Sequence, residues 1–251
     1  MSLLRSLAFN LLFWLWTTVA VLGMSPMLLG PPRWSSRAQF VWAAGTEFLA
    51  RHVLGIRFRV RGRENIPAGA VIVACKHQSA YETIVMSLML PNPAVVMKRE
   101  LLAIPIYGWY SLRMGMIPVD RSASSLAMRQ MLRAAERAAA ENRAIVIFPE
   151  GTRTAPGAAP HYLPGVAGLY RHLNLPVVPV AIDSGLLWGR NAFKKHPGTV
   201  TFQYLPPIMP GLDRRVFMAE LEERIESATA ALLAESGFRG QEHEQAGESR
   251  G

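Results

Sequence analysis

A histidine and a glutamate stand five residues apart in the stretch KHQSAYE, residues 76–82, which lies between the apolar runs AVIVAC and TIVMSLML. Within one continuous helix, a step of five residues turns the side chains by about 500°, so His77 and Glu82 would point apart. If His77 lies in the loop before the helix and Glu82 in its first turn, the carboxylate can accept a hydrogen bond from one imidazole nitrogen. The other nitrogen is then a base that can take a proton from a hydroxyl group beside it.

The same stretch also fits a capping box, in which Ser79 caps the helix and Glu82 reaches back to it. That interpretation explains Ser79 and Glu82 but gives no role to His77. A pair with this spacing arises often by chance, so the stretch alone leaves both interpretations open.

A second group of polar residues follows the apolar run AIVIF in the segment IVIFPEGTRT, residues 145–154. We expect a buried strand to end at Pro149, Glu150 and Gly151 to form a turn, and Arg153 to project from the next loop. This edge of a parallel sheet is a common place for ligand sites. An arginine there can bind a phosphate through two charge-assisted hydrogen bonds. A solvated turn with an exposed arginine is the alternative.

A third segment, VVMKRELLAIPIYGWY at residues 95–110, places cations beside an apolar and aromatic stretch. Lys98 and Arg99 close an apolar strand and precede residues that include Trp109. This combination suits a molecule with a phosphate head and an acyl tail, although a core strand followed by a packed loop fits as well. A fourth segment, LPVVPVAID at residues 175–183, predicts a structural strand, near an edge or irregular because of its two prolines.

Strand-like and helix-like runs alternate through the rest of the chain. Helices are predicted at residues 81–90, 124–142 and 215–235, and this alternation is typical of an α/β domain. We therefore expect an α/β fold with a mixed, largely parallel sheet flanked by helices over residues 55–238, followed by a polar, disordered tail at 239–251. The predicted strands are RFRVRG (57–62), AVIVAC (70–75), AVVMK (94–98), MIPV (116–119), AIVIF (144–148), VVPVAI (177–182) and TVTFQYL (199–205).

The N-terminal 54 residues indicate contact with a membrane. Residues 6–24 carry no charge and approach the ~20 apolar residues that cross a bilayer. After a break at a Gly-Pro-Pro triplet, residues 35–54 form a second helical pattern, so we expect a membrane-associated hairpin, with core packing as the alternative for its second helix. Arg33 and Arg37 follow the first segment while Arg5 precedes it, which places the downstream domain in the cytoplasm if the segment spans. An interfacial anchor and a cleaved signal peptide are the alternatives.

The composition restricts the class of protein. The 251 residues are 50% hydrophobic, enough for a substantial core, and the formal net charge of +9 favours an anionic partner. The single cysteine, Cys75, excludes an internal disulfide and cysteine-based metal sites, and it is expected to pack as a small apolar side chain. Scattered basic residues without a nucleic-acid-binding signature argue against nucleic acid. The chain lacks the G-x-S-x-G motif of serine hydrolases.

Taken in order, the four segments resemble the glycerolipid acyltransferase family, and within it the bacterial 1-acyl-sn-glycerol-3-phosphate acyltransferases. The family is marked by a histidine four residues clear of an acidic residue, a K-x-E-L block, an F-P-E-G-x-R block and a V-P-[VI] strand. Here these are His77 with Glu82, residues 98–101, residues 148–153 and residues 178–180. The resemblance covers roughly residues 57–207 and depends on four blocks in a fixed order.

The resemblance implies transfer of a fatty acyl group from acyl-CoA or acyl-carrier protein to the sn-2 hydroxyl of 1-acyl-glycerol-3-phosphate (lysophosphatidic acid), giving phosphatidic acid without a metal or cofactor. His77 would be the general base and Glu82 would orient its imidazole. The family's usual acidic residue is aspartate. The extra methylene of Glu82 moves the carboxylate by about 1.5 Å, which its helix position or rotamer must compensate.

The resemblance also assigns substrate-binding residues. Lys98 and Arg153 would hold the acceptor phosphate with help from Arg99, while Glu150 and Gly151 would shape the acceptor site. The enzyme would work at the inner membrane with its catalytic domain on the cytoplasmic face. Acylation of another lyso-lipid, such as a lyso-ornithine lipid, is the nearest alternative. A non-catalytic lipid-binding protein of the membrane surface is a remote one, because it would not need the four polar blocks.

Overall fold

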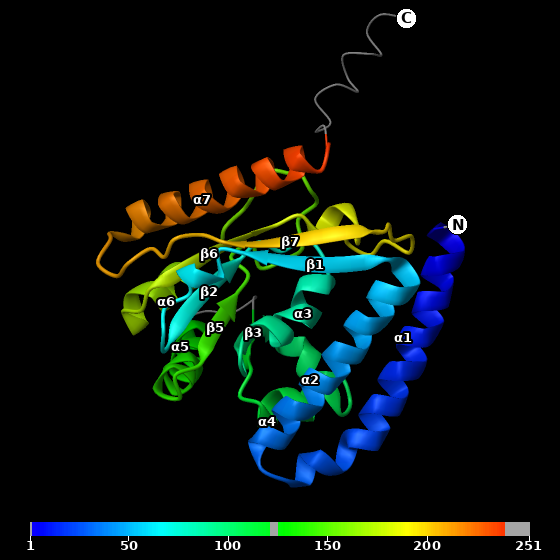
Figure 1. Ribbon diagram of the computed structural model, residues 1–251. Coiled ribbons are helices and arrows are strands. Elements are labelled where there is room, and N and C mark those ends of the chain that lie inside the picture. Colours follow the sequence, from blue (N-terminus) through cyan, green and yellow to red (C-terminus); the bar gives the residue numbers. More distant parts are fainter. Residues whose placement is uncertain (1, 121–124, 239–251) are drawn as a thin grey trace, which may run out of the picture.

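A seven-stranded sheet forms the centre of the molecule in the computed structural model, which describes residues 2–120 and 125–238 (Figure 1). The strand order is β1-β7-β6-β2-β5-β3-β4, and every neighbouring pair is parallel except β6 with β7. The predicted strands and the mixed, largely parallel sheet are therefore confirmed. The strands are β1 (Ile56–Arg61), β2 (Val71–Cys75), β3 (Ala94–Lys98), β4 (Ile117–Val119), β5 (Ala144–Ile147), β6 (Val177–Ile182) and β7 (Gly198–Tyr204).

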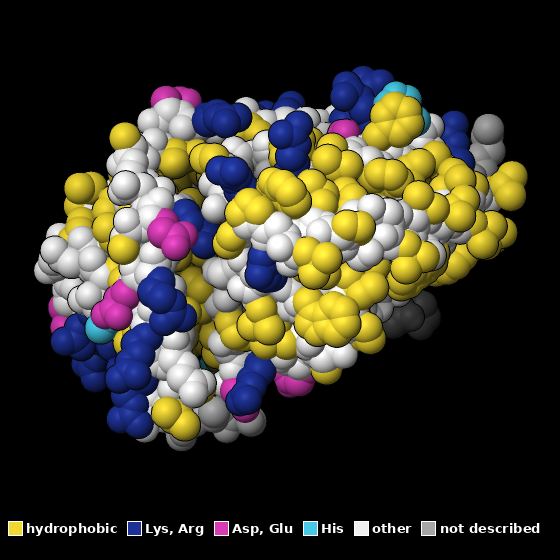
Figure 2. All heavy atoms as spheres, turned by 90° about the horizontal axis from the view of Figure 1, so that it is seen from below, with side chains coloured by type: hydrophobic (Ala, Val, Ile, Leu, Met, Phe, Trp, Pro, Cys, Tyr) yellow, Lys and Arg dark blue, Asp and Glu magenta, His cyan; other side chains and the backbone are white. Residues whose placement is uncertain are grey.

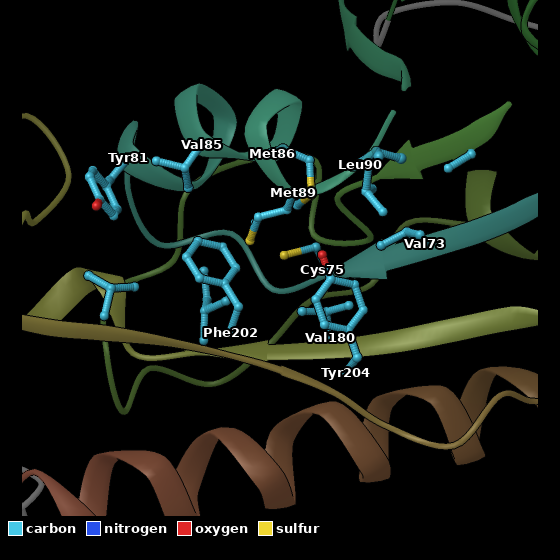
Figure 3. Close-up of a cluster of buried hydrophobic side chains, with 14 of the residues drawn as sticks. Val73, Cys75, Tyr81, Val85, Met86, Met89, Leu90, Val180, Phe202 and Tyr204 are labelled. Atoms are coloured by element: carbon cyan, nitrogen blue, oxygen red, sulfur yellow. The ribbon is translucent and has the colours of Figure 1, made fainter. Parts of the chain in front are cut away.

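Helices cover both faces of the sheet, because successive side chains of a strand point to opposite faces. On one face, Val73 and Cys75 of β2 pack against α3 (Tyr81–Met89), which Figure 3 shows lying over the sheet. On the other face, Ile72 and Ala74 belong to the cluster formed with three more helices. These are α5 (Ser125–Ala140), α6 (Gly165–Leu173) and α7 (Arg214–Glu235).

Cys75 is fully buried in the first of these clusters and forms no disulfide. Burial, followed by the nearby negative charge of Glu82, raises the pKa of its thiol well above the usual value. The thiol therefore stays neutral and unreactive at physiological pH. The prediction that Cys75 packs as a small apolar side chain is confirmed.

The predicted helices at residues 81–90, 124–142 and 215–235 correspond to α3, α5 and α7, although residue 124 lies outside the described residues. Two helices were not predicted, α4 (Tyr107–Arg113) and α6. Both are short and begin within two residues of a proline, and both contain glycine, which weakens the helical pattern in the sequence. Five short helical segments of the described residues complete the fold, and all are 3₁₀ helices except the π-helix η2: η1 (Ser25–Leu29), η2 (Ala50–Leu54), η3 (Arg63–Asn65), η4 (Arg99–Ala103) and η5 (Ser184–Leu186).

The predicted edge position of the strand with two prolines is wrong, since β6 lies between β7 and β2 inside the sheet. Pro179 is tolerated because it lies just beyond the ladder with β7, whose first paired residue on β6 is Val180. At that point only the carbonyl is needed, and Pro179 O accepts a hydrogen bond from Leu205 N at 2.9 Å. The missing N–H of the proline therefore does not interrupt the ladder, which begins at the next residue.

The N-terminal segment forms the expected hairpin of α1 (Ser2–Met24) and α2 (Pro32–Leu49), which lie side by side in Figure 1. Two tryptophans join them: Trp16 Nε1 donates to Trp42 O at 3.0 Å, and Trp42 Nε1 donates to Thr17 Oγ1 at 3.1 Å. The proline break is confirmed, and Pro32 occupies the first turn of α2, where its missing N–H costs nothing.

The hairpin leaves much of its apolar surface exposed. Phe40 and Phe48 of α2 are each at least half exposed, so core packing does not account for these two side chains, although Leu49 of the same helix packs against the core. In the part of the chain that the structure describes, one helix, Ser2–Leu29, is long and apolar enough to cross a membrane. Most of this helix is not buried inside the protein. Phe9 is an exception, because its side chain lies in the hydrophobic core and so joins α1 to the α/β domain.

Candidate active site

The predicted site residues follow three neighbouring parallel strands. His77 lies directly after β2, residues 150–153 follow β5, and Lys98 is the last residue of β3. Since β5 lies between β2 and β3 and all three run the same way, these segments leave the sheet at one edge.

The predicted contact between His77 and Glu82 is present. His77 Nδ1 lies 2.8 Å from Glu82 Oε1, with His77 in the loop after β2 and Glu82 in the first turn of α3. The side chain of His77 is 12% exposed and that of Glu82 is completely buried. The carboxylate therefore fixes the Nδ1 side of the ring, and Nε2 is the nitrogen left to meet a ligand.

Glu82 accepts hydrogen bonds at both carboxylate oxygens. Its Oε1 also accepts from Gln78 N at 2.8 Å and Ser79 N at 2.6 Å, and its Oε2 accepts from Ser184 Oγ at 2.8 Å. Ser184 belongs to η5, after β6, and is itself fully buried. Four donors thus hold one buried carboxylate and fix the direction in which it meets His77.

The capping interpretation of the same stretch is partly confirmed. Glu82 reaches back to Ser79 N as a capping box requires, but Ser79 Oγ accepts from Tyr81 N at 3.1 Å, one residue earlier than in that motif. A single carboxylate oxygen therefore starts the helix and holds the imidazole. The two interpretations describe one arrangement.

The segment after β5 holds the main chain and ring of His77. Glu150 Oε2 accepts from His77 N at 2.7 Å, and His77 O accepts from Thr154 N at 2.8 Å. The imidazole stacks on Phe148 with 4.2 Å between ring centroids. The turn is tight at Gly151, whose φ of +64° suits glycine and whose N donates to Phe148 O.

The predicted phosphate-binding cations lie at the surface of this edge. Lys98 is exposed and pairs with Glu100 at 3.0 Å, while Arg99 is exposed and lies 3.9 Å from Asp120. Arg153 is partly exposed, and its guanidinium has no hydrogen-bond partner among residues 2–120 and 125–238. Its carbonyl accepts from Arg190 Nη1 at 3.2 Å, which brings a second guanidinium beside it.

Four residues of the site lie outside the sequence predictions: Lys76, Ser184, Arg190 and Glu226. Lys76 precedes the histidine, and its Nζ lies 2.8 Å from Glu150 Oε1 and 2.7 Å from Glu226 Oε1. Ser184 and Glu226 are 102 and 150 residues away from their partners, so local spacing gives no signal for them. Within the described ranges, no group of three or more metal-ligating side chains occurs.

Comparison with known proteins identifies the family. A model described as Acyltransferase matches residues 57–183, just over half of the chain. A 1-acyl-sn-glycerol-3-phosphate acyltransferase from Pseudomonas aeruginosa is 34% identical over 203 residues, covering 80% of this chain and 79% of that protein. The chain belongs to the acyltransferase family. The family match contains both members of the His77–Glu82 pair and all the predicted substrate-binding residues of this acyltransferase.

Other relatives extend the comparison. A 1-acyl-sn-glycerol-3-phosphate acyltransferase from Limnanthes douglasii is 28% identical over 158 residues, covering 62% of this chain and 56% of that protein. The crystal structure of the 1-acyl-sn-glycerophosphate acyltransferase PlsC from Thermotoga maritima superposes with a TM-score of 0.72, covering 93% of this acyltransferase and 98% of that chain. Since the identity there is 22%, this likeness shows a shared fold.

Proposed function

We propose that this acyltransferase transfers a fatty acyl group from an acyl thioester to the sn-2 hydroxyl of lysophosphatidic acid, giving phosphatidic acid. The observation that carries the proposal is the contact of 2.8 Å between His77 Nδ1 and the buried carboxylate of Glu82, at the edge where Lys98 and Arg153 are also presented. The name of the Pseudomonas aeruginosa relative supports the choice of acceptor.

The chemistry follows from the state of the imidazole. Glu82 accepts the Nδ1–H hydrogen bond, so Nε2 carries the lone pair that takes the proton from the acceptor hydroxyl. The hydroxyl oxygen attacks the thioester carbonyl, a C–O bond forms and the C–S bond breaks. The imidazolium returns its proton to the departing thiolate, and Glu82 stabilises the positive charge while it exists. A general base of this kind contributes about 10²- to 10⁴-fold to the rate.

Binding of the acceptor phosphate is proposed for the exposed cations of the same edge. The guanidinium of Arg153 has no hydrogen-bond partner among the described residues and can make two parallel hydrogen bonds to phosphate oxygens, while Lys98 and Arg99 add positive charge. Gly151 permits the turn that presents Arg153. Glu150 shapes the acceptor site indirectly in this proposal, because both of its carboxylate oxygens are engaged by Lys76 and the main chain of His77.

Attachment to the cytoplasmic face of the inner membrane is part of the proposal. Figure 2 shows a broad hydrophobic surface on one side of the molecule, with Lys and Arg side chains around it. Trp14 of α1 is 66% exposed and Trp109 of α4 is 60% exposed, and Tyr110 of α4 donates to Met24 O at the end of α1. Exposed aromatic residues of this kind favour the membrane interface, where the lipid acceptor resides.

The test is the acceptor range of the full-length protein purified in detergent. Lysophosphatidic acid and a lyso-ornithine lipid are supplied separately with labelled acyl-CoA or acyl-carrier protein, and labelled products are separated by chromatography. Phosphatidic acid from lysophosphatidic acid is the expected product, and the more productive donor identifies the thioester used. Acylation of the lyso-ornithine lipid without any phosphatidic acid would overturn the assignment, and the His77→Ala variant controls for a contaminating enzyme.

A further inference from the structure

A buried lysine lies directly behind the catalytic histidine. Lys76 is 2% exposed, and its ammonium group contacts carboxylates from two different parts of the chain. Its Nζ lies 2.8 Å from Glu150 Oε1 and 2.7 and 2.8 Å from the two oxygens of Glu226. Two hydrogen bonds to Glu226 and an ion-pair contact with Glu150 thus place negative charge on two sides of the ammonium group.

The lysine is connected to His77 through Glu150. One oxygen of this carboxylate faces Lys76, and the other accepts from the main-chain N of His77 at 2.7 Å. Lys76 N itself donates to Val180 O at 2.9 Å, which ties the end of β2 to β6. A shift of the ammonium would therefore move Glu150 and, with it, the backbone from which the imidazole extends.

The far end of the network is the C-terminal helix. Glu226 lies on α7, outside the residues 57–183 that match the family model. Tyr162 donates to Glu226 Oε1 at 2.8 Å, so the glutamate is held from the loop before α6 as well. Burial, followed by the charge of Glu226, raises the pKa of Tyr162, which keeps its hydroxyl protonated as a donor.

We propose that Lys76 and Glu226 are positioning residues for acyl transfer, and that α7 is part of the device that aligns His77 with the acceptor hydroxyl. This inference rests on the proposed role of His77 as general base. Neither residue contacts the reacting atoms; Glu226 fixes Lys76, Lys76 fixes Glu150, and Glu150 fixes the main chain of His77. A buried ion cluster is a weak source of stability, because the cost of desolvating its charges offsets much of their attraction. We therefore assign the cluster of Lys76, Glu150 and Glu226 the function of aligning His77.

The test uses Glu226→Gln in the full-length protein. The amide keeps an acceptor for Tyr162 but removes the charge that holds Lys76, and the side chain is 25% exposed, so the fold tolerates the change. Because a displacement of about 1 Å can cost up to ~10²-fold in rate, we expect kcat to fall by about 10-fold. The KM for the acceptor should not change, because the phosphate-binding cations are untouched. Glu223→Gln, the same change at an exposed position of α7, is the matched control.

A second pair of variants keeps the test decisive if loss of charge also weakens the fold. Lys76→Met leaves the buried carboxylate of Glu150 without its cation, and kcat should fall further. Adding Glu150→Gln removes that charge while its amide oxygen still accepts from His77 N, so part of the lost kcat should return. Melting temperatures are measured throughout, and rates are compared well below the lowest of them.

The outcomes separate this inference from the proposed function. If the wild-type protein acylates no lyso-lipid, the proposed function fails before any variant is compared. If the wild type is active and Glu226→Gln retains kcat within about twofold of Glu223→Gln, the positioning role is overturned. A double variant that is no more active than Lys76→Met would also overturn it, and so would a rise in acceptor KM at unchanged kcat.

Discussion

Shortening Glu82 by one methylene tests why this enzyme carries glutamate at the position. In Glu82→Asp the carboxylate retreats by about 1.5 Å toward the backbone of α3. The main-chain donors Gln78 N and Ser79 N lie in the turn just before the helix, so this turn can shift to keep its hydrogen bonds to the shortened carboxylate. The side-chain partners His77 Nδ1 and Ser184 Oγ, each 2.8 Å away, would be left at about 4.3 Å, beyond hydrogen-bond range.

The magnitude follows from the hydrogen bonds that are lost. A hydrogen bond to a charged group contributes about 1.5–3 kcal/mol, and each ~1.4 kcal/mol in the barrier changes the rate tenfold. Loss of the contact between His77 and Glu82 should therefore lower kcat by about 10- to 150-fold. The unpaired hydroxyl of Ser184, buried beside the carboxylate, should cost about 1–3 kcal/mol of folding free energy, which lowers the melting temperature by about 2–12 °C.

The assay is the initial rate of acylation at varied acceptor and donor concentrations, with a thermal melt of each preparation. Glu223→Asp makes the same change on the exposed face of α7 and should match the wild type in both measurements. A Glu82→Asp variant with wild-type kcat and melting temperature would refute the reasoning, because the length of the side chain would then be irrelevant to His77.

Three further variants examine the other contacts of the site. Glu82→Gln preserves the length of the side chain and the helix cap but loses the negative charge. We expect kcat to fall by at least ~10²-fold with little loss of stability. Full activity would show that Glu82 acts only as a capping residue. Arg153→Ala should raise the KM for the acceptor more than that for the donor, because a bidentate phosphate contact is lost, and an unchanged acceptor KM would contradict that role. Ser184→Ala leaves Oε2 of the buried Glu82 without its donor. The free energy of unfolding, measured by denaturant titration, should therefore fall by about 1–3 kcal/mol. Unchanged stability would show that another group replaces the hydroxyl.

The sequence predicted the sheet well because its strands are continuous runs of apolar, β-branched residues. Residues 70–75 and 144–148 have few alternatives to buried parallel strands, and they become β2 and β5. The order of strands could not be predicted in this way. Pro179 suggested an edge strand, but its place just beyond the ladder with β7 makes an interior position acceptable, and only the paired strands reveal that register.

The site was predictable where its residues are close in sequence. His77 and Glu82 meet because a strand, a loop and a helix follow one another within a few residues, and that pattern can be recognised locally. Ser184 and Glu226 are brought to the site by the neighbouring strand β6 and by α7, which packs across the sheet. Their own surroundings in the sequence are ordinary, so their roles depend on the folded arrangement alone.

The proposed acyl transfer depends most directly on His77 as the base that activates the acceptor hydroxyl. The decisive measurement is the rate of phosphatidic acid formation from lysophosphatidic acid by wild-type protein and by His77→Ala, with circular dichroism to show that both are folded. We predict a loss of at least ~10²-fold in kcat with the fold intact. A folded His77→Ala variant with near-normal turnover would contradict the central claim.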